Sequence, residues 1–429
     1  MGCSDSSLPK PRPQSTHPQY PTTIYTPPII APGRPIMTIA QPHPQDVDFA
    51  YDPLPDLHGV IDELRAAGPV VPVTYHGGRA WLITGFDALK EAFSDEVHFQ
   101  AAAAYRVHSE PSMGKTIQTM AGNEHRINRA LVSSPFFPRQ VRERVESLLE
   151  PEAHAVVDRF AGAAEVDLIA AYARPYPYRV ITRMLGIPTH DEQTFLEWAL
   201  KLIDFPWDPE GALRARQDFS AYMAPIIESR RQQPADDVLS ILATTAFEGH
   251  YLDDEQILSF CRLLFPAGSD TTYKILGSLL TYILRDPALV ALARGSDDER
   301  AALVQEGLRI ESPTALLPRM CSKDIRFHGA AMQAGDWVLF GVTAANSDPA
   351  VFPEPRRFLP GRDNKNLAFG HGVHFCLGSH LARRELECSL KVLFERFPAM
   401  CIAPGREPSI TGAVMRGPQH LWVEPGAGA

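Results

Sequence analysis

Apolar residues recur at helical spacing along much of this chain, whereas strand-like runs are short. Leu57, Val60, Ile61 and Leu64 fall on one face of a helix predicted over residues 57–67. Two apolar runs then flank the glycine pair at 77–78 and predict a hairpin. The pattern favours a mostly α protein with small β-sheets, with hairpin strands over 69–75 and 79–84, further helices over 86–93, 141–160, 191–205 and 212–233, and short strands over 325–342.

The longest helical pattern runs from residue 253 to residue 284, and apolar residues occupy most of its circumference. Such a helix is buried through the middle of a protein. Its centre reads Pro266-Ala267-Gly268-Ser269-Asp270-Thr271-Thr272, although helix interiors avoid proline, glycine and consecutive β-branched residues. We therefore expect a local kink, with a carboxylate and a hydroxyl facing the core.

A second stretch, from Phe369 to Gly378, places one cysteine after a glycine-rich turn and directly before a helix predicted over 377–390. Gly370 and Gly372 allow the backbone to take positive φ and lie against a flat ligand. At a helix start, backbone N–H groups and the helix dipole favour the thiolate of Cys376 over its thiol. A thiolate held in this way is a good axial ligand for haem iron.

Two other roles of Cys376 do not involve haem. It could be a buried structural cysteine in a surface turn, or a zinc ligand together with His371, His374 and His380. Structural zinc sites usually pair two or more cysteines at close spacing, whereas this stretch has one. A c-type haem would require C-x-x-C-H, which the sequence lacks.

Composition narrows the class of protein. The 429 residues are 45% hydrophobic and 21% charged, which is ordinary for a globular protein. The formal charge of −10, without any Lys/Arg run, argues against a nucleic-acid binder. The six scattered cysteines fit a reducing compartment, and there is neither an apolar run of about 18 residues nor a secretory-signal layout. We expect a cytoplasmic protein.

The first 36 residues contain nine prolines and no periodic apolar pattern. Such a segment cannot bury enough apolar area to order itself. We expect a disordered, proline-rich extension over 1–44 and one folded domain over 45–429. Two further interpretations of this segment stay open: the start Met1-Gly2-Cys3-Ser4 matches a myristoylation pattern, and Met37 could be the true start.

The cysteine stretch resembles the haem-binding signature of cytochrome P-450, F-G-x-G-x-H-x-C-x-G, at every fixed position. The centre of the long helix resembles the A-G-x-[DE]-T-T element of the same family, and similarity extends over roughly residues 45–425. The resemblance implies the cytochrome P-450 fold, with the haem buried between the long central helix and the cysteine loop. The absence of an N-terminal anchor points to the soluble bacterial-type branch.

The resemblance also implies the cofactor and its contacts. The cofactor would be haem b, with Cys376 as its iron ligand, and Asp270 and Thr271 would deliver protons for oxygen activation. His125, Arg129, Arg319 and His374 would converge on the two haem carboxylates. The remaining residues expected at the haem are Ala267, Gly268, Phe369, Gly370 and Gly378.

A structural motif of the family, E-x-x-R, is formed by Glu306 and Arg309, three residues apart on one helix face. In the family this pair is locked to an arginine in the loop before the cysteine. Arg357 is our choice for that third member, and Arg362 is the alternative.

The implied activity is that of a monooxygenase, which inserts one oxygen atom of O2 into a hydrophobic terpenoid, aromatic or steroid-like molecule. A hydrogen-peroxide-dependent peroxygenase of the same fold and a non-catalytic haem-binding or sensor protein are the alternatives. Both would do without the Asp270–Thr271 pair. Candidate substrate-pocket residues are Phe99, Tyr105, Met120, Leu264, Phe265, Thr314, Leu316, Leu317 and Val414.

No flavin or ferredoxin module is encoded, because the chain has no G-x-G-x-x-G unit and no length left for one. Electrons would come from a separate ferredoxin and its NAD(P)H-dependent reductase. The expected docking face is the basic cluster of Arg383, Arg384 and Lys391 on the cysteine side, which suits an acidic partner. The enzyme is expected to be a monomer. Residues 99–120, which lack periodicity, would form the loop that closes over the substrate.

Overall fold

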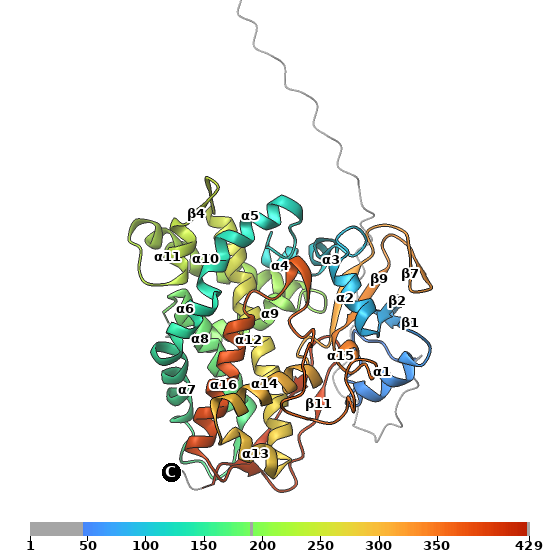
Figure 1. Ribbon diagram of the computed structural model, residues 1–429. Coiled ribbons are helices and arrows are strands. Elements are labelled where there is room, and N and C mark those ends of the chain that lie inside the picture. Colours follow the sequence, from blue (N-terminus) through green and yellow to red (C-terminus); the bar gives the residue numbers. More distant parts are fainter. Residues whose placement is uncertain (1–45, 189–191, 427–429) are drawn as a thin grey trace, which may run out of the picture. The chain divides into compact units, whose positions relative to one another are not determined.

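The computed structural model describes residues 46–188 and 192–426. The expectations for residues 1–44 lie outside this range. All described residues belong to one unit of the chain, Ala40–Ala429. Within it the helices predominate and the sheets are small, as the hydrophobic pattern predicts (Figure 1).

The largest sheet has four strands in the order β1-β2-β9-β6. The predicted hairpin is confirmed: β1 (Val70–Tyr75) and β2 (Gly78–Ile83) are antiparallel, and Gly77 takes the positive φ of 71° that their tight turn requires. β9 (Trp337–Gly341) pairs parallel to β2 and antiparallel to β6 (Leu316–Met320). α1 (Leu57–Arg65) and α2 (Phe86–Ser94) flank this sheet near their predicted positions.

The region between residues 99 and 120 is more regular than its lack of periodicity indicates. It contains α3 (Ala101–His108) and α4 (Glu110–Met113), so the expectation of a simple loop is wrong in this respect. The four consecutive alanines at 101–104 supply high helix propensity without any amphipathic signal.

Further helices make up most of the molecule. They are α5 (Gly122–Ser133), α6 (Pro138–Arg144), α7 (Glu150–Val157), α8 (Pro175–Leu185), α9 (Glu192–Ile203), α10 (Pro209–Gln232), α11 (Val238–Thr244), α13 (Pro287–Ala293), α14 (Asp297–Ile310) and α15 (Val342–Asn346), with short turns of helix η2 (Ser134–Phe136), η3 (Val145–Leu149), η4 (Ile169–Ala173) and η5 (Gly372–His374). The predicted helix over 141–160 is thus divided among α6, η3 and α7.

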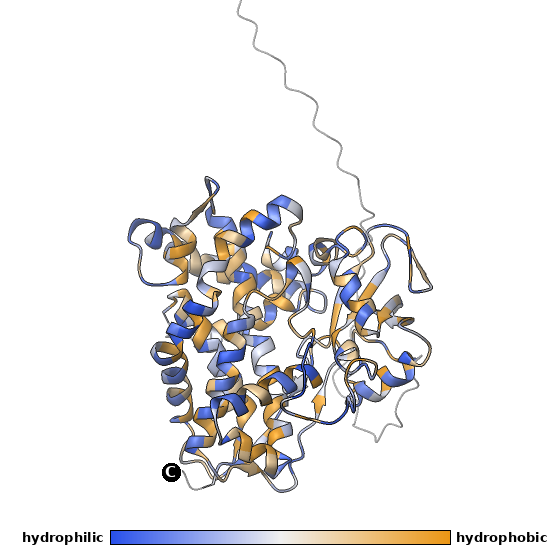
Figure 2. Ribbon diagram, in the orientation of Figure 1, coloured by the Kyte–Doolittle hydropathy of each residue, from blue (hydrophilic) through white to orange (hydrophobic). Residues whose placement is uncertain are grey.

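The long helix α12 (Asp254–Leu284) begins at a capping box in which Asp253 accepts a hydrogen bond from the N–H of Gln256. It packs against α8, α14 and α16 (Ser379–Arg396), and apolar residues cover it along most of its length (Figure 2). Pro266 has no N–H to donate, yet the helix continues through it without interruption.

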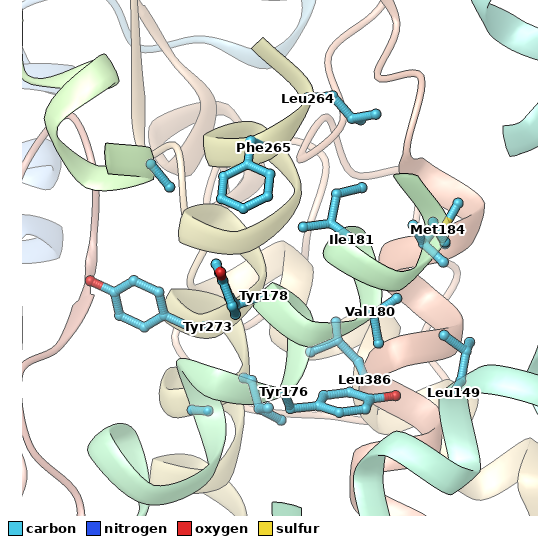
Figure 3. Close-up of a cluster of buried hydrophobic side chains, with 14 of the residues drawn as sticks. Leu149, Tyr176, Tyr178, Val180, Ile181, Met184, Leu264, Phe265, Tyr273 and Leu386 are labelled. Carbon is cyan, nitrogen blue, oxygen red and sulfur yellow. The ribbon is translucent and has the colours of Figure 1, made fainter. Parts of the chain in front are cut away.

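The main core lies between these helices. Figure 3 shows Tyr178 and Ile181 of α8 beside Leu264 and Phe265 of α12, and the rings of Tyr178 and Phe265 meet edge to face at 5.4 Å. α8 approaches α12 so closely that a Cβ on Gly268 would lie 3.3 Å from the side chain of Ile181. Gly268 therefore has a packing reason to be glycine.

The remaining strands are short. A three-stranded sheet has the order β10-β13-β3, formed by β10 (Cys401–Ile402), β13 (Trp422–Glu424) and β3 (Val166–Asp167). The two-stranded hairpins are β4 (Ala246–Phe247) with β5 (His250–Tyr251), β7 (Ile325–Phe327) with β8 (Ala330–Met332), and β11 (Ile410–Thr411) with β12 (Gly417–Pro418). Among the described helices, none is both long and apolar enough to cross a membrane.

The buried ion pair on α14 corrects one of our assignments. Glu306 and Arg309 are paired at 2.7 Å, and the third member is Arg362, whose Nε donates to Glu306 at 3.0 Å. The choice of Arg357 is wrong. Its side chain points outward to Glu354, and only its backbone carbonyl accepts a hydrogen bond from Arg309. The chain has to turn back before an arginine can reach Glu306, and Arg362 lies after that turn.

Candidate functional site

The cysteine loop is held in a tight, glycine-dependent shape. Gly370 and Gly372 have φ of 73° and 75°, and a Cβ on Gly372 would lie 2.9 Å from the carbonyl oxygen of Phe93. The N–H of Cys376 donates to the carbonyl of Phe369 at 2.9 Å, which closes the loop. α16 begins at Ser379, slightly later than predicted, so Cys376 lies just before the helix rather than on its first turn.

A cavity of about 1430 Å³, including its opening to solvent, lies between this loop and α12. Phe369, Gly370, Cys376 and Gly378 line one side, and Ala267, Gly268, Thr271 and Thr272 of α12 also line it.

The electrostatics around Cys376 are mixed. The side chain of Cys376 is exposed only to the cavity that it lines, and protein surrounds it on its other sides. Burial raises the pKa of the Cys376 thiol, while the N–H of Gly378 and the cations Arg129 and Arg383 work to lower it. A metal bound to the sulfur would remove the proton outright.

Four basic side chains gather at one edge of the cavity, of which Arg129, Arg319 and His374 line it directly. The ring of His125 lies behind that of His374, with centroids 4.3 Å apart. Burial, with His125, Arg319 and Arg129 nearby, lowers the pKa of His374 to about 3. His374 is therefore neutral at neutral pH. Burial also lowers the pKa of His125.

Within the described ranges, these basic groups lack acidic partners at hydrogen-bond distance. The Nε2 atoms of His125 and His374 are both buried without a hydrogen-bond partner, and Glu96 lies 3.8 Å from the latter. Among the described residues, neither Arg129 nor Arg319 forms an ion pair, and each donates only to a backbone carbonyl. Buried donors and cations in this state fit a ligand that carries carboxylates. The site therefore fits haem, with Cys376 as the iron ligand.

On α12, the two residues expected to deliver protons face different surroundings. Thr271 lines the cavity, and its hydroxyl donates to the carbonyl of Ala267 at 2.9 Å. Asp270 does not line the cavity, because consecutive helix residues point about 100° apart. Its Oδ1 accepts from Lys274 at 2.5 Å, whereas its Oδ2 is buried without a partner.

The substrate-pocket expectations are met in part. Tyr105, Leu264, Thr314 and Leu317 line the cavity. Tyr105 also stacks on Arg319, whose guanidinium carbon lies 5.0 Å from the ring centroid.

The other five pocket candidates do not line this cavity, because each packs into a core cluster or a neighbouring segment instead. Phe265 faces the rings of Phe195 and Phe219 on α9 and α10, and Phe99 packs on Phe327 and Phe340. The residues that these corrections concern are Phe99, Met120, Phe265, Leu316 and Val414.

Sequence reasoning missed two charged residues here. Glu385 of α16 lines the cavity and contacts Thr272, and burial raises its pKa well above the ordinary value. Its position three and four residues after Ala382 and Leu381, which also line the cavity, is the helical spacing that could have revealed it. Lys274, the partner of Asp270, could likewise have been found from its i,i+4 spacing.

Comparison with known proteins agrees with this geometry. The model of the cytochrome P-450 family matches residues 301–421. Cytochrome P-450 monooxygenase PikC of Streptomyces venezuelae is 32% identical over 389 residues, covering 87% of this chain and 91% of its own. The vitamin D(3) 25-hydroxylase of Pseudonocardia autotrophica is 30% identical over 361 residues, covering 81% and 88%.

Solved structures show the same fold. The cytochrome P-450 PksS of the bacillaene polyketide synthase of Bacillus subtilis 168 superimposes with a TM-score of 0.80 at 28% identity. The superposition covers 89% of this chain and 99% of that one.

Proposed function

This chain belongs to the cytochrome P-450 family of monooxygenases, and we propose that it uses haem b to insert one atom of O2 into a hydrophobic small molecule. The observation that carries the proposal is the cavity itself. Cys376 and Thr271 both line it, and a cluster of basic groups without acidic partners at hydrogen-bond distance among the described residues lies at its edge. Residues 45–429 would form the haem domain.

The bound haem would supply the oxygen-activating chemistry, which consumes two electrons and two protons. Cys376 would hold it by its sulfur, and Arg129, Arg319, His374 and His125 would hold its carboxylates. Binding of the haem carboxylates at this edge would give the two buried histidine nitrogens the hydrogen-bond acceptors that they lack.

Proton delivery would fall to α12. The hydroxyl of Thr271 already donates to Ala267 and still has lone pairs to accept a hydrogen bond at the cavity surface. Asp270 lies one residue away and is paired with Lys274. This pair interacts electrostatically with Asp204, which follows α9 and whose pKa is raised by burial and by Asp270 although Lys201 and Lys274 work to lower it. We propose that protons reach Thr271 from this charged group.

The substrate would be a terpenoid, aromatic or steroid-like molecule, because the side chains above the haem position are mainly apolar. Phe260, Leu263, Leu264 and Leu317 line this part of the cavity. The name of the vitamin D(3) 25-hydroxylase assigns a steroid-like substrate to one relative, which supports this class.

Electrons would come from a ferredoxin and its NAD(P)H-dependent reductase. A surface depression brings together side chains of α6, η3 and α16, and it is lined by Arg139, Arg142, Arg384, Glu143, Glu146 and Val145. Arg139 is paired with Glu143 and Arg384 with Glu387, whereas Arg142 forms no ion pair among the described residues. The arginines of this surface could pair with acidic residues of a protein partner. The described cysteines are all free, which supports a reducing compartment, the cytoplasm, and we take the enzyme to act as a monomer.

Turnover assays separate the proposal from its rivals. With NADPH, a surrogate ferredoxin and reductase and a library of hydrophobic compounds, we expect product and NADPH oxidation that both depend on a substrate that shifts the haem Soret band. Product formed with hydrogen peroxide but not with NADPH would establish a peroxygenase. Binding without turnover under either condition would establish a haem-binding protein.

A further inference from the structure

Arg383 on α16 lies behind the cysteine loop and faces inward. Its guanidinium carbon is 4.4 Å from the ring centroid of Phe369, the shortest separation of this kind among the described residues. Phe369 lines the cavity and Arg383 does not, so the aromatic ring separates this cation from the cavity. A guanidinium on an aromatic face is a fixed, oriented charge.

The charge of Arg383 is not neutralised by a contact in the described part of the chain. Its NH1 donates to the carbonyl of Ser379 at 3.4 Å, and its Nε is buried without a hydrogen-bond partner. The nearby carboxylate of Glu387 is bound by Arg384 instead. Arg383 also lies close enough to Cys376 for the two groups to interact electrostatically.

Its neighbour Arg384 has the opposite environment. Arg384 is exposed, forms an ion pair with Glu387 and lines the surface depression beside Arg142. The two arginines, adjacent in sequence and assigned together to the docking face, therefore point to different places.

We propose that Arg383 is a positioning residue that sets the reduction potential of the haem, and that it does not act in partner docking. This inference rests on the proposed function, because it requires a haem bound through Cys376. The step concerned is the transfer of one electron from the reduced iron–sulfur protein to the ferric haem, which becomes ferrous.

Reduction adds one negative charge to the group beside Cys376, and a nearby cation stabilises the added charge. The half-buried setting lowers the effective dielectric constant, so the cation acts more strongly than it would in water. Arg383 also offsets the negative charge of the sulfur, which otherwise disfavours reduction. Removing the charge should therefore make the reduction potential more negative and slow the first electron transfer.

Redox titration of the intact holoenzyme with small mediator dyes tests this without a protein partner. Arg383→Gln and Arg383→Leu should both shift the potential to more negative values, and Arg383→Lys should shift it less because a positive charge remains. Arg384→Gln is the matched control. It should keep the wild-type potential and instead raise the KM for ferredoxin, an effect that depends on ionic strength.

Both neutral variants must first show haem content and the CO-bound thiolate band, which distinguishes a failure of the proposed function from a failure of this inference. A wild-type protein without that band would overturn the proposed function itself. If the band is present but the neutral variants keep the wild-type potential, or if Arg383→Lys shifts it as much as Arg383→Gln, the inference about Arg383 is wrong. Since two neutral side chains of different shape are used, failure of one to fold leaves the other as the test.

Discussion

Replacing Lys274 by methionine removes the positive charge that faces Asp270 and keeps the length and apolar character of the side chain. The carboxylate is 2% exposed and Lys274 is 13% exposed, so water cannot take over the role of the ammonium group. Burial works to lower the pKa of Lys274, but Asp270 and the hydroxyl of Tyr273 outweigh it and raise that pKa above its ordinary value. Lys274 is therefore charged at every pH considered below.

Two limits determine how much free energy of unfolding Lys274→Met loses. Breaking a buried ion pair by removing one partner costs about 3–5 kcal/mol while the other charge persists. In the variant, protonation of Asp270 would remove the unpaired buried charge, and protonating an ordinary aspartate costs about 1.4 kcal/mol per pH unit above ~3.9. The loss in the free energy of unfolding should therefore be about 3–5 kcal/mol at pH 8 and about 1.5–2 kcal/mol at pH 5.

Thermal unfolding of the wild-type and Lys274→Met proteins at both pH values measures this difference. With an unfolding entropy of ~2.1 cal/mol/K per residue over roughly 380 described residues, the melting temperature should fall by about 5 °C at pH 8 and about 2 °C at pH 5. The double variant Asp270→Asn/Lys274→Met should recover most of the loss, because no buried charge remains. An equal loss at both pH values, or no recovery in the double variant, would show that Asp270 is not a buried charge that depends on Lys274.

Further predictions concern catalysis, the structural ion pair and the N-terminal segment. Thr271→Ala should still bind substrate and oxidise NAD(P)H but divert most electrons to hydrogen peroxide, because a positioned proton donor contributes about 10²–10⁴-fold to the rate. Asp270→Asn should instead slow the whole cycle. The amounts of product and peroxide formed per NAD(P)H oxidised measure both effects, and an unchanged product yield per NAD(P)H in Thr271→Ala would remove that residue from the mechanism. Arg362→Leu should cost about 1.5–3 kcal/mol of stability, the typical worth of a hydrogen bond to a charged group, because Arg309 still pairs with Glu306. Arg357→Leu should cost less than about 1 kcal/mol, since its ion pair is exposed. Urea titration measures both losses, and equal losses would contradict the assignment. Deleting residues 1–36 should leave haem content and activity unchanged, since the segment is rich in proline and lacks a periodic apolar pattern, and a melting temperature several degrees lower would show that it packs on the domain.

The sequence predicted those parts of the fold that local pattern determines. The hairpin around Gly77, the length of α12 and the glycine-dependent cysteine loop each follow from spacing and backbone chemistry within a short stretch. The helices α3 and α4 were missed because an alanine run has high propensity but no amphipathic period.

The direction in which individual side chains point in the folded protein was harder to predict. Arg357 and Arg362 are equivalent in composition, and only the course of the chain after α15 decides which of them reaches Glu306. Phe265 and Leu264 are adjacent apolar residues on one helix, and the sequence does not say which one faces the cavity and which one packs on α9 and α10. In the same way, the sequence does not determine that the side chain of Arg383 points inward and that of Arg384 outward.

Both the proposed activity and the role of Arg383 depend on Cys376 binding haem iron as a thiolate, and the spectrum of the reduced, CO-bound protein reports that bond. We expect the red-shifted Soret band that thiolate ligation produces, and Cys376→His should retain some haem while losing that band. A wild-type protein without the band, or a Cys376→His variant that keeps it, would show that Cys376 is not the thiolate ligand.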